Sequence, residues 1–193
     1  MRKIAVAVLM LCLLGCADRQ AKVEFVGTDV SGSQIGDDLG LTDQDGKVRH
    51  LSDFKGKLVV LFFGYTHCPD ICPTTLMELT KAMRLLGPKG REVQVLFVTL
   101  DPARDQPGVL KQYVPSFDPS FIGLWGSEKQ TQQVAKDFRI FYAKQASGGR
   151  SGYSIDHSAG LYIFDKKGRI RVYSNPGQGA KDIAGDLGKL LNE

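Results

Sequence analysis

The stretch Phe62–Thr75, FFGYTHCPDICPTT, carries two thiols at close spacing. Three residues separate Cys68 from Cys72, and a proline follows each of them. Thiol pairs of this kind act as redox dithiols or as part of a metal site, and they also occur as inert buried side chains or structural disulfides. The spacing alone does not separate these alternatives, so the elements around the thiols have to be considered.

The start of the chain predicts a lipoprotein signal peptide. Arg2 and Lys3 precede an uncharged apolar run, Ile4–Leu14, which is shorter than the roughly 20 residues that a membrane-spanning helix needs. The run ends in Leu13-Leu-Gly-Cys16, a sequence that resembles the lipobox of bacterial lipoproteins, in which the cysteine becomes the lipidated first residue. The alternative is an ordinary secretory signal with a chance cysteine.

The lipoprotein interpretation divides the chain into three parts. These are a signal peptide over residues 1–15, a polar tether over residues 16–28 that carries lipid on Cys16, and a folded domain over residues 29–193. The protein is then exported and lipid-anchored on the outer (periplasmic) side of the bacterial cytoplasmic membrane. Because Cys12 leaves with the signal peptide, Cys68 and Cys72 are the thiol pair of a domain that folds where disulfides form and persist.

Composition and charge exclude several classes of protein. The 193 residues are 42% hydrophobic and 24% charged, which argues against a disordered chain and against a membrane protein with several spans. The formal net charge is only +4, and no cluster of Lys and Arg is interleaved with aromatic residues. We therefore expect no nucleic acid as a partner.

The apolar pattern predicts the elements that position the thiols. Leu58–Phe63 and Val93–Val98 are continuous apolar runs, typical of strands that are buried on both faces. Helical spacing predicts helices over about 74–86, 107–114 and 128–139 and around Ile183–Leu191, with a capping box at Ser127. Turn signals predict an N-terminal hairpin over 41–48 and a second hairpin over 161–173. The Gly/Ser-rich stretch 144–154 is expected to be a mobile loop.

The order strand, helix, strand, helix, helix, hairpin, helix predicts an α/β fold. Alternating strands and helices imply right-handed crossovers and a central parallel pair, which the antiparallel hairpin completes. This arrangement is a thioredoxin-like central sheet flanked by helices, with an N-terminal hairpin extension. In such a fold the loop after the first central strand leads into a helix, and the two cysteines occupy that loop.

Pro73 indicates where this helix begins. Proline clashes with the preceding turn in a helix interior but is favoured at the first helical position. We therefore expect Pro73 at that position, Cys72 at the N-cap and Cys68 on the preceding loop. Free amides and the positive end of the helix dipole lower the pKa of a thiol there from its usual value of about 8.5. Both disulfide exchange and metal binding use the thiolate that results.

A metal would need a ligand in addition to the thiolates, and the chain has three histidines. We expect His50 at the surface, and His67 points away from the adjacent cysteine because neighbouring side chains on an extended chain diverge. His157 lies before the strand at Leu161, where thioredoxins carry a cis-proline that packs against the cysteines. The alternative for His157 is a structural histidine at a strand entrance. Two thiolates and one imidazole form a soft three-ligand set suited to copper, Cu(I) especially, whereas structural zinc normally takes four ligands.

Several segments together resemble the Sco/SenC family of copper-binding, thioredoxin-like proteins. They are Phe62–Thr75, Thr99-Leu-Asp-Pro102, Arg104-Asp105 and Asp156-His157. The resemblance extends from about Val26 to the C-terminus, and the combination of C-P-D-x-C-P with the downstream Asp-His pair is specific.

The resemblance implies that Cys68, Cys72 and His157 bind copper, as Cu(I) and also as Cu(II). It further implies a metallochaperone rather than a turnover enzyme, which helps to assemble the dinuclear copper centre, CuA, of cytochrome c oxidase. The expected partners are the copper-accepting subunit of that oxidase and another copper chaperone or a thiol reductant. Asp156 is a candidate to hydrogen-bond the second nitrogen of the imidazole, or else to shape the loop or lie near the open face of the copper.

A thiol:disulfide oxidoreductase is the alternative function. The Cys68–Cys72 dithiol would then reduce the cysteines of the target copper site, and His157 would not be strictly needed. A thiol peroxidase is disfavoured, because the Pro-x-x-x-Thr-x-x-Cys pattern of peroxiredoxins is missing around Cys68.

Overall fold

The structure is a computed structural model, and it describes residues 23–36, 38–146 and 152–193. Cys12 and Cys16 lie outside the described residues, so the signal peptide and the lipidation of Cys16 stay predictions. Within the described residues, no helix combines the length and the apolar character that crossing a bilayer requires.

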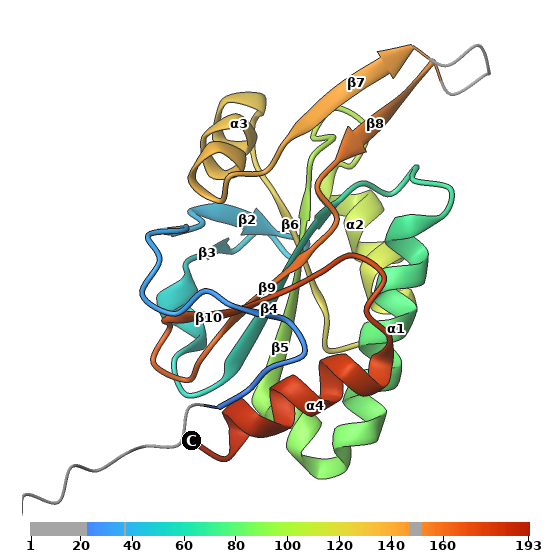
Figure 1. Ribbon diagram of the computed structural model, residues 1–193. Coiled ribbons are helices and arrows are strands. Elements are labelled where there is room, and N and C mark those ends of the chain that lie inside the picture. The colour runs from blue at the N-terminus through green and yellow to red at the C-terminus, as the bar shows by residue number, and fades with distance from the viewer. Residues whose placement is uncertain (1–22, 37, 147–151) are drawn as a thin grey trace, which may run out of the picture.

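A mixed eight-stranded sheet runs through the domain in the order β1-β10-β9-β4-β5-β6-β2-β3 (Figure 1). Its strands are β1 (Thr28–Asp29), β2 (Leu41–Asp43), β3 (Val48–Arg49), β4 (Leu58–Gly64), β5 (Val93–Thr99), β6 (Ile122–Trp125), β9 (Leu161–Phe164) and β10 (Ile170–Ser174). β4, β5 and β6 are parallel, and the other neighbours pair antiparallel. The sheet therefore contains the predicted strands and both predicted hairpins.

The parallel part of the sheet has three strands, whereas the sequence predicted two. The missing strand is β6, whose four residues include Gly123. A Cβ at this glycine would lie 3.1 Å from side-chain atoms of Leu110 and Val114. The small residue therefore lets α2 (Pro107–Tyr113) and the 3₁₀ turn η3 (Val114–Ser116) pack closely on the strand. Glycine weakens the local strand signal, and pairing with β5 and β2 compensates for it.

Helices cover both faces of the sheet. They are α1 (Ile71–Leu86), α2 (Pro107–Tyr113), α3 (Glu128–Asp137) and α4 (Ala180–Leu191), with the 3₁₀ turns η1 (Leu51–Phe54), η2 (Gly87–Glu92) and η3 (Val114–Ser116). Alternate residues of β4 point to opposite faces. Phe62 packs with residues of α1, α2 and α4 on one face, and Phe63 packs with η1 and α3 on the other. Burial on both faces explains the continuous apolar run of β4.

Helix α1 begins earlier than predicted. Asp70 is its N-cap, and Ile71 is its first residue, so Cys72 lies within the first turn and Pro73 is the third helical residue. The expectation of Cys72 at the N-cap was wrong. The physical reason is that the first four N–H groups of a helix have no intrahelical partner, so proline is tolerated anywhere in the first turn. The thiols still lie at the N-terminal end of the helix.

Both ends of the stretch predicted as a loop over 144–154 belong to the strands of a β-hairpin. β7 (Tyr142–Ala146) pairs antiparallel with β8 (Tyr153–His157), and the two form a sheet of their own. Figure 1 shows this hairpin projecting beyond the main sheet. The mobile-loop expectation was wrong for the strand residues, because cross-strand pairing orders polar residues that have little strand signal themselves. Residues 147–151 lie outside the described residues.

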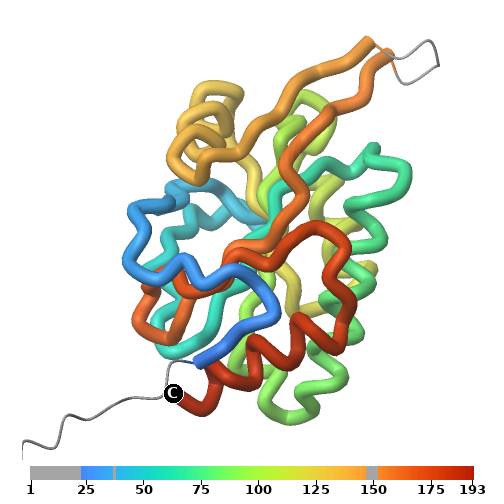
Figure 2. The backbone as a smooth tube through the Cα atoms, in the orientation of Figure 1, coloured from blue at the N-terminus to red at the C-terminus, as the bar shows by residue number. Residues whose placement is uncertain are grey.

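The last residues of the predicted tether contact the domain. The N–H groups of Val26 and Gly27 donate to the buried carboxylate of Asp186 in α4, both at 2.8 Å. Lys189 of the same helix donates to the carbonyl of Glu24. Figure 2 shows the blue start of the coloured tube, from residue 23 onward, lying beside α4. Residues 24–27 are thus tied to the folded domain, and residues 16–22 of the expected tether lie outside the described part.

Candidate metal site

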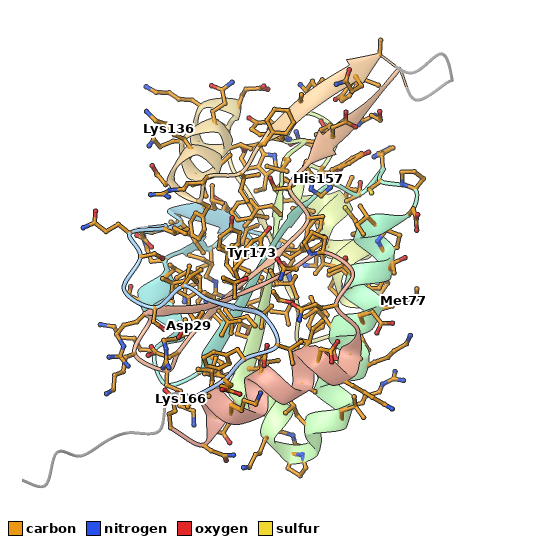
Figure 3. The ribbon with its side chains drawn as sticks, viewed as in Figure 1. Asp29, Met77, Lys136, His157, Lys166 and Tyr173 are labelled. Carbon is orange, nitrogen blue, oxygen red and sulfur yellow. The ribbon has the colours of Figure 1, made fainter. Side chains whose placement is uncertain are left out.

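Three sequence-predicted ligands meet at one end of the sheet. Cys68 lies on the loop between β4 and α1, Cys72 lies in the first turn of α1, and His157 is the last residue of β8. One ligand atom from each of the three lies within 4.8 Å of the others. His157 is found where the projecting hairpin meets the body (Figure 3). The structure therefore brings together residues that are up to 89 positions apart in the chain.

The two thiols are chemically unequal. Cys72 is fully buried, and Cys68 is slightly accessible. The N–H of Cys72 donates to Sγ of Cys68 at 3.4 Å. The hydrogen bond from the Cys72 thiol lowers the pKa of Cys68, despite partial burial, and contacts with the Asp70 and Cys72 amides act in the same direction. The same thiol–thiolate bond and deep burial raise the pKa of Cys72. The pair therefore shares one proton, with the negative charge on Cys68.

Gly64 makes room for the inner thiol. A Cβ at this position would lie 2.7 Å from Sγ of Cys72 and 2.9 Å from the ring of Phe97, closer than side-chain atoms pack. Gly64 is the last residue of β4, so the strand can end directly beneath the sulfur. The sequence analysis did not identify this residue. A glycine at the end of an apolar strand, just before a functional loop, indicates that another group packs closely against the backbone there.

The ring of His157 is oriented for metal binding. Its Nδ1 lies 2.9 Å from the carbonyl oxygen of Ser158, and since a carbonyl only accepts, Nδ1 carries the proton. Nε2 then offers its lone pair, 3.5 Å from Sγ of Cys72. A carbonyl on the second ring nitrogen is a common way to fix a metal-binding histidine. The ring also lies edge-on to Tyr65, with centroids 5.9 Å apart.

The acceptor for Nδ1 is the Ser158 carbonyl and not the carboxylate of Asp156. Asp156 is exposed, and its neighbour His157 points to the other face of β8, as expected for adjacent strand residues. The hydrogen-bonding role considered for Asp156 is thus filled by the backbone. The physical reason is that the Ser158 carbonyl, just after the end of β8, lies within reach of the His157 ring. The side chain of Asp156 points to the opposite face of the strand and cannot reach it.

Tyr65 joins the cysteine loop to the histidine strand. Its hydroxyl accepts a hydrogen bond from the N–H of Ile155 at 3.2 Å, and both residues are buried. Tyr65 lies three residues before Cys68, and Ile155 lies two before His157. The sequence analysis quoted Tyr65 within the motif but gave it no role, because nothing local shows that it reaches β8.

The other two histidines lie away from the ligand set, as expected. Nδ1 of His50 lies 2.5 Å from the carboxylate of Asp38, and both side chains are about half exposed. His67 is exposed, and its ring lies 3.1 Å from the hydroxyl of Thr66 and 3.8 Å from the carboxylate of Asp105. Neither forms a group of three potential metal ligands in the described part of the chain.

The donor set decides which metals the site suits. Two sulfurs and one imidazole nitrogen are soft or borderline ligands, and three of them leave a coordination position open. Cu(I) prefers such a set, whereas Mg²⁺ and Ca²⁺ require oxygen ligands. The same two thiols can also exchange electrons as a dithiol and disulfide. The geometry therefore supports copper binding and thiol chemistry at one location.

A family model and a curated relative point to the same protein family. The SCO1/SenC family model matches residues 28–192. A SCO2-like protein of Rickettsia felis is 40% identical over 137 residues, which cover 70% of this chain and 67% of the relative.

Two solved structures show the same fold. Bradyrhizobium japonicum ScoI with copper bound has 37% identity and a TM-score of 0.74, and the match covers 81% of this chain and 99% of that one. Apo Sco1 of Thermus thermophilus has 39% identity and a TM-score of 0.77, with 88% and 99% covered. The likeness confirms the predicted thioredoxin-like α/β fold, and the match over most of the chain shows that this protein belongs to the SCO1/SenC family.

Proposed function

We propose that this protein is a copper metallochaperone that delivers copper to the CuA centre of cytochrome c oxidase. The observation that carries the proposal is the convergence of Cys68, Cys72 and His157, whose ligand atoms lie within 4.8 Å of one another. The copper-bound state of the similar Bradyrhizobium ScoI supports copper as the cargo. Copper would be held as Cu(I), and the imidazole also suits Cu(II).

Transfer fits a site that is accessible on one side. His157 is partly accessible and Cys68 slightly so, whereas Cys72 is fully buried. Ligands of an acceptor can therefore approach from the side of Cys68 and His157, and copper can pass by stepwise ligand exchange without a change of oxidation state. The acceptor in this proposal is the copper-receiving subunit of the oxidase, and a second copper chaperone would supply the metal.

The test is metal analysis of the reduced protein after anaerobic loading with Cu(I). We expect one copper per wild-type chain and loss of the stable complex in His157→Ala, with the thiols still able to form a disulfide. A His50→Ala variant is the matched control, because this histidine pairs with the carboxylate of Asp38, away from the three predicted ligands. If His157→Ala holds copper as tightly as the wild type, the metal is bound by the thiols alone and the proposal loses its main support.

A thiol:disulfide oxidoreductase is the second candidate, and the inequality of the two thiols favours it. In this function the Cys68 thiolate attacks a disulfide of the target, and a mixed disulfide forms as one target thiolate leaves. Cys72 then loses its proton and attacks Sγ of Cys68, which releases the second target thiolate. Two electrons pass to the target, and a separate thiol reductant must restore the dithiol.

Alkylation would test this second candidate. Because the pKa of Cys68 is lowered and that of Cys72 raised, iodoacetamide should modify Cys68 first, even below the pH at which an ordinary thiol reacts. Peptide mass spectrometry identifies the modified residue. Preferential modification of Cys72 would contradict the assignment of the attacking thiol.

Lipid anchoring belongs to the same proposal. We propose that Cys16 is the acylated N-terminus of the mature protein and holds the domain on the periplasmic side of the cytoplasmic membrane. The apolar run that ends at Leu14 supports it. Intact-mass spectrometry of protein extracted from membranes is the test, and an unmodified N-terminus at another residue would refute the lipid anchor.

A further inference from the structure

The segment Thr99–Asp105 lies beside the metal site without contributing a ligand. It begins at the last residue of β5, the parallel neighbour of β4, and the carboxyl ends of parallel strands meet at the same edge of a sheet. Two of its carboxylates, Asp101 and Asp105, are fully buried. Buried carboxylates are costly unless they are hydrogen-bonded or paired with a charge, so the partners of these two indicate what the segment does.

Asp105 holds the cysteine loop. Its carboxylate accepts hydrogen bonds from the N–H of Thr66 at 2.9 Å and from the hydroxyl of Thr66 at 2.5 Å. The hydroxyl of Thr99 donates to the same carboxylate at 2.7 Å. Thr66 lies two residues before Cys68. The three bonds therefore tie the loop that carries the first thiol to the end of β5.

Asp101 and Arg104 hold the histidine strand. The hydroxyl of Tyr153, the first residue of β8, donates to Asp101 at 2.7 Å. Nε of Arg104 donates to the same carboxylate, and Nη1 donates to the carbonyl of Tyr153 at 3.0 Å. The guanidinium also lies over the ring of Tyr153, 3.7 Å from its centroid. Arg104 thus contacts both the backbone and the ring of Tyr153.

The two halves of the segment are themselves linked. The hydroxyl of Thr99 accepts from the N–H of Asp101 at 2.9 Å while it donates to Asp105, and the N–H of Asp105 donates to the carbonyl of Asp101 at 2.8 Å. The contacts to Thr66 and to Tyr153 therefore start from one compact turn. A shift of either contact would move the turn that carries the other.

We propose that Asp101, Arg104 and Asp105 are positioning residues that set the separation between the thiols and the imidazole. The need for such residues follows from the topology, because β7 and β8 form a sheet of their own. Hence β8 cannot be held in place by the backbone ladder of the main sheet. Arg104 acts through His157, and Asp105 acts through Cys68. This inference rests on the proposed copper site for its main test.

The test is a double-mutant cycle for Cu(I) affinity, measured in competition with calibrated Cu(I) chelators. We expect Arg104→Ala to weaken binding by about 10-fold, a usual loss when a residue that orients a metal ligand is removed. In the His157→Ala background, the same change should have no further effect on the residual affinity of the thiols, since the residue acts through the imidazole. Asp105→Asn should weaken binding in both backgrounds, because it acts through the thiols.

Arg49→Ala is the matched control. Like Arg104, Arg49 pairs with a buried carboxylate and lies over an aromatic ring. Its Nε is 2.7 Å from the carboxylate of Asp43, and its guanidinium is 5.9 Å from the ring centroid of Phe54. It belongs to β3, at the far edge of the sheet from β4. Tyr153→Phe is the milder variant of the contact, because it removes the hydroxyl and keeps the ring. An equal loss of copper affinity in Arg49→Ala, or an Arg104→Ala effect that persists without His157, would overturn the proposal.

A measurement on the metal-free protein separates this inference from the proposed function. Hydrogen exchange at the amides of residues 153–157 should be faster in Arg104→Ala and unchanged in Arg49→Ala. If the wild type binds no copper, the proposed function fails, and the exchange result still decides whether the segment positions β8. Unchanged exchange in Arg104→Ala would refute the positioning role even if copper binds.

Discussion

The thiols and the imidazole of the candidate metal site are supported in different ways. Cys68 and Cys72 lie between β4 and α1, where the strand is buried on both faces and the helix packs against the sheet. His157 lies on β8, which pairs only with β7 within the described residues. The cysteine half of the site, Cys68 and Cys72, is therefore part of the core. The histidine half, His157 on β8, is held by side-chain contacts from Tyr65, Arg104 and their partners.

This difference bears on the copper transfer that we propose above. A ligand pair in the core keeps its geometry when the metal leaves, because many packed residues determine it. A ligand on a hairpin attached by a few hydrogen bonds can move at a smaller free-energy cost. In the proposed transfer, copper release would therefore begin at the His157 side.

Oxidation of the cysteine half should have the largest effect. A Cys68–Cys72 disulfide removes both thiolates and leaves His157 as the remaining predicted ligand, and since only thiolates ligate, copper binding should fall to background. Metal analysis of oxidised protein, and of the same sample after reduction, measures this loss and its recovery. One copper retained by oxidised protein without reductant would contradict the ligand assignment.

Gly64→Ala should damage the cysteine half through packing alone. The added Cβ would lie 2.7 Å from Sγ of Cys72, and overpacking of this kind costs about 1–3 kcal/mol in the free energy of unfolding. Gly185→Ala in α4 is the control, because its Cβ would meet no atom within 4 Å, and alanine in a helix stabilises by about 0.5–1 kcal/mol. Urea unfolding of both variants gives the comparison, and equal stability of Gly64→Ala and wild type would show that the sulfur has space to move.

Asp156→Ala should have a smaller effect on the histidine half. Because Nδ1 of His157 donates to the carbonyl of Ser158, loss of the exposed carboxylate should reduce Cu(I) affinity by less than about 10-fold. Competition titration against a calibrated chelator measures it. A loss of 10- to 100-fold would show that Asp156 orients the ring or contacts the bound copper after all.

The pair His50–Asp38 should give the smallest effect, and one that depends on pH. The hydrogen bond to Asp38 raises the pKa of His50 above 6.5. The pair's contribution to the free energy of unfolding is therefore complete below about pH 6.5, and it is lost as the pH rises through the raised pKa of His50. The pKa of Asp38 is lowered, although burial opposes this, by bonds to His50 and the Leu51 amide, so the pair also weakens at acidic pH below 3.8. Thermal unfolding of wild type and His50→Gln between pH 5 and 9 should converge at the alkaline end, and copper affinity should not change.

The cysteine half could be predicted from the sequence because it is local. The apolar run of β4, the loop with Cys68 and the start of α1 follow one another within Leu58–Leu86, so periodicity and proline rules place the thiols at a helix N-terminus. Only the first residue of the helix was misplaced. The prolines allowed more than one starting point, and the N-cap at Asp70 was decided by the folded loop.

The hairpin β7–β8 and the strand β6 could not be predicted in the same way. β7 is mostly exposed and contains no β-branched residue, and β6 contains Gly123, so neither has a strong strand pattern. Each becomes a strand because a partner supplies its hydrogen bonds, and partners are set by the tertiary structure.

The sequence by itself determined the thiol pair, its strand-to-helix setting and, through resemblance, the three residues predicted as ligands. Only the tertiary structure decided how those ligands are held. Sγ of Cys72 and Nε2 of His157 are 85 residues apart in the chain and 3.5 Å apart in space, and the Arg104 contact to Tyr153 spans 49 residues. Periodicity reports which face of an element is buried, but it carries no information on which distant side chain will meet it, because that depends on how the whole chain packs.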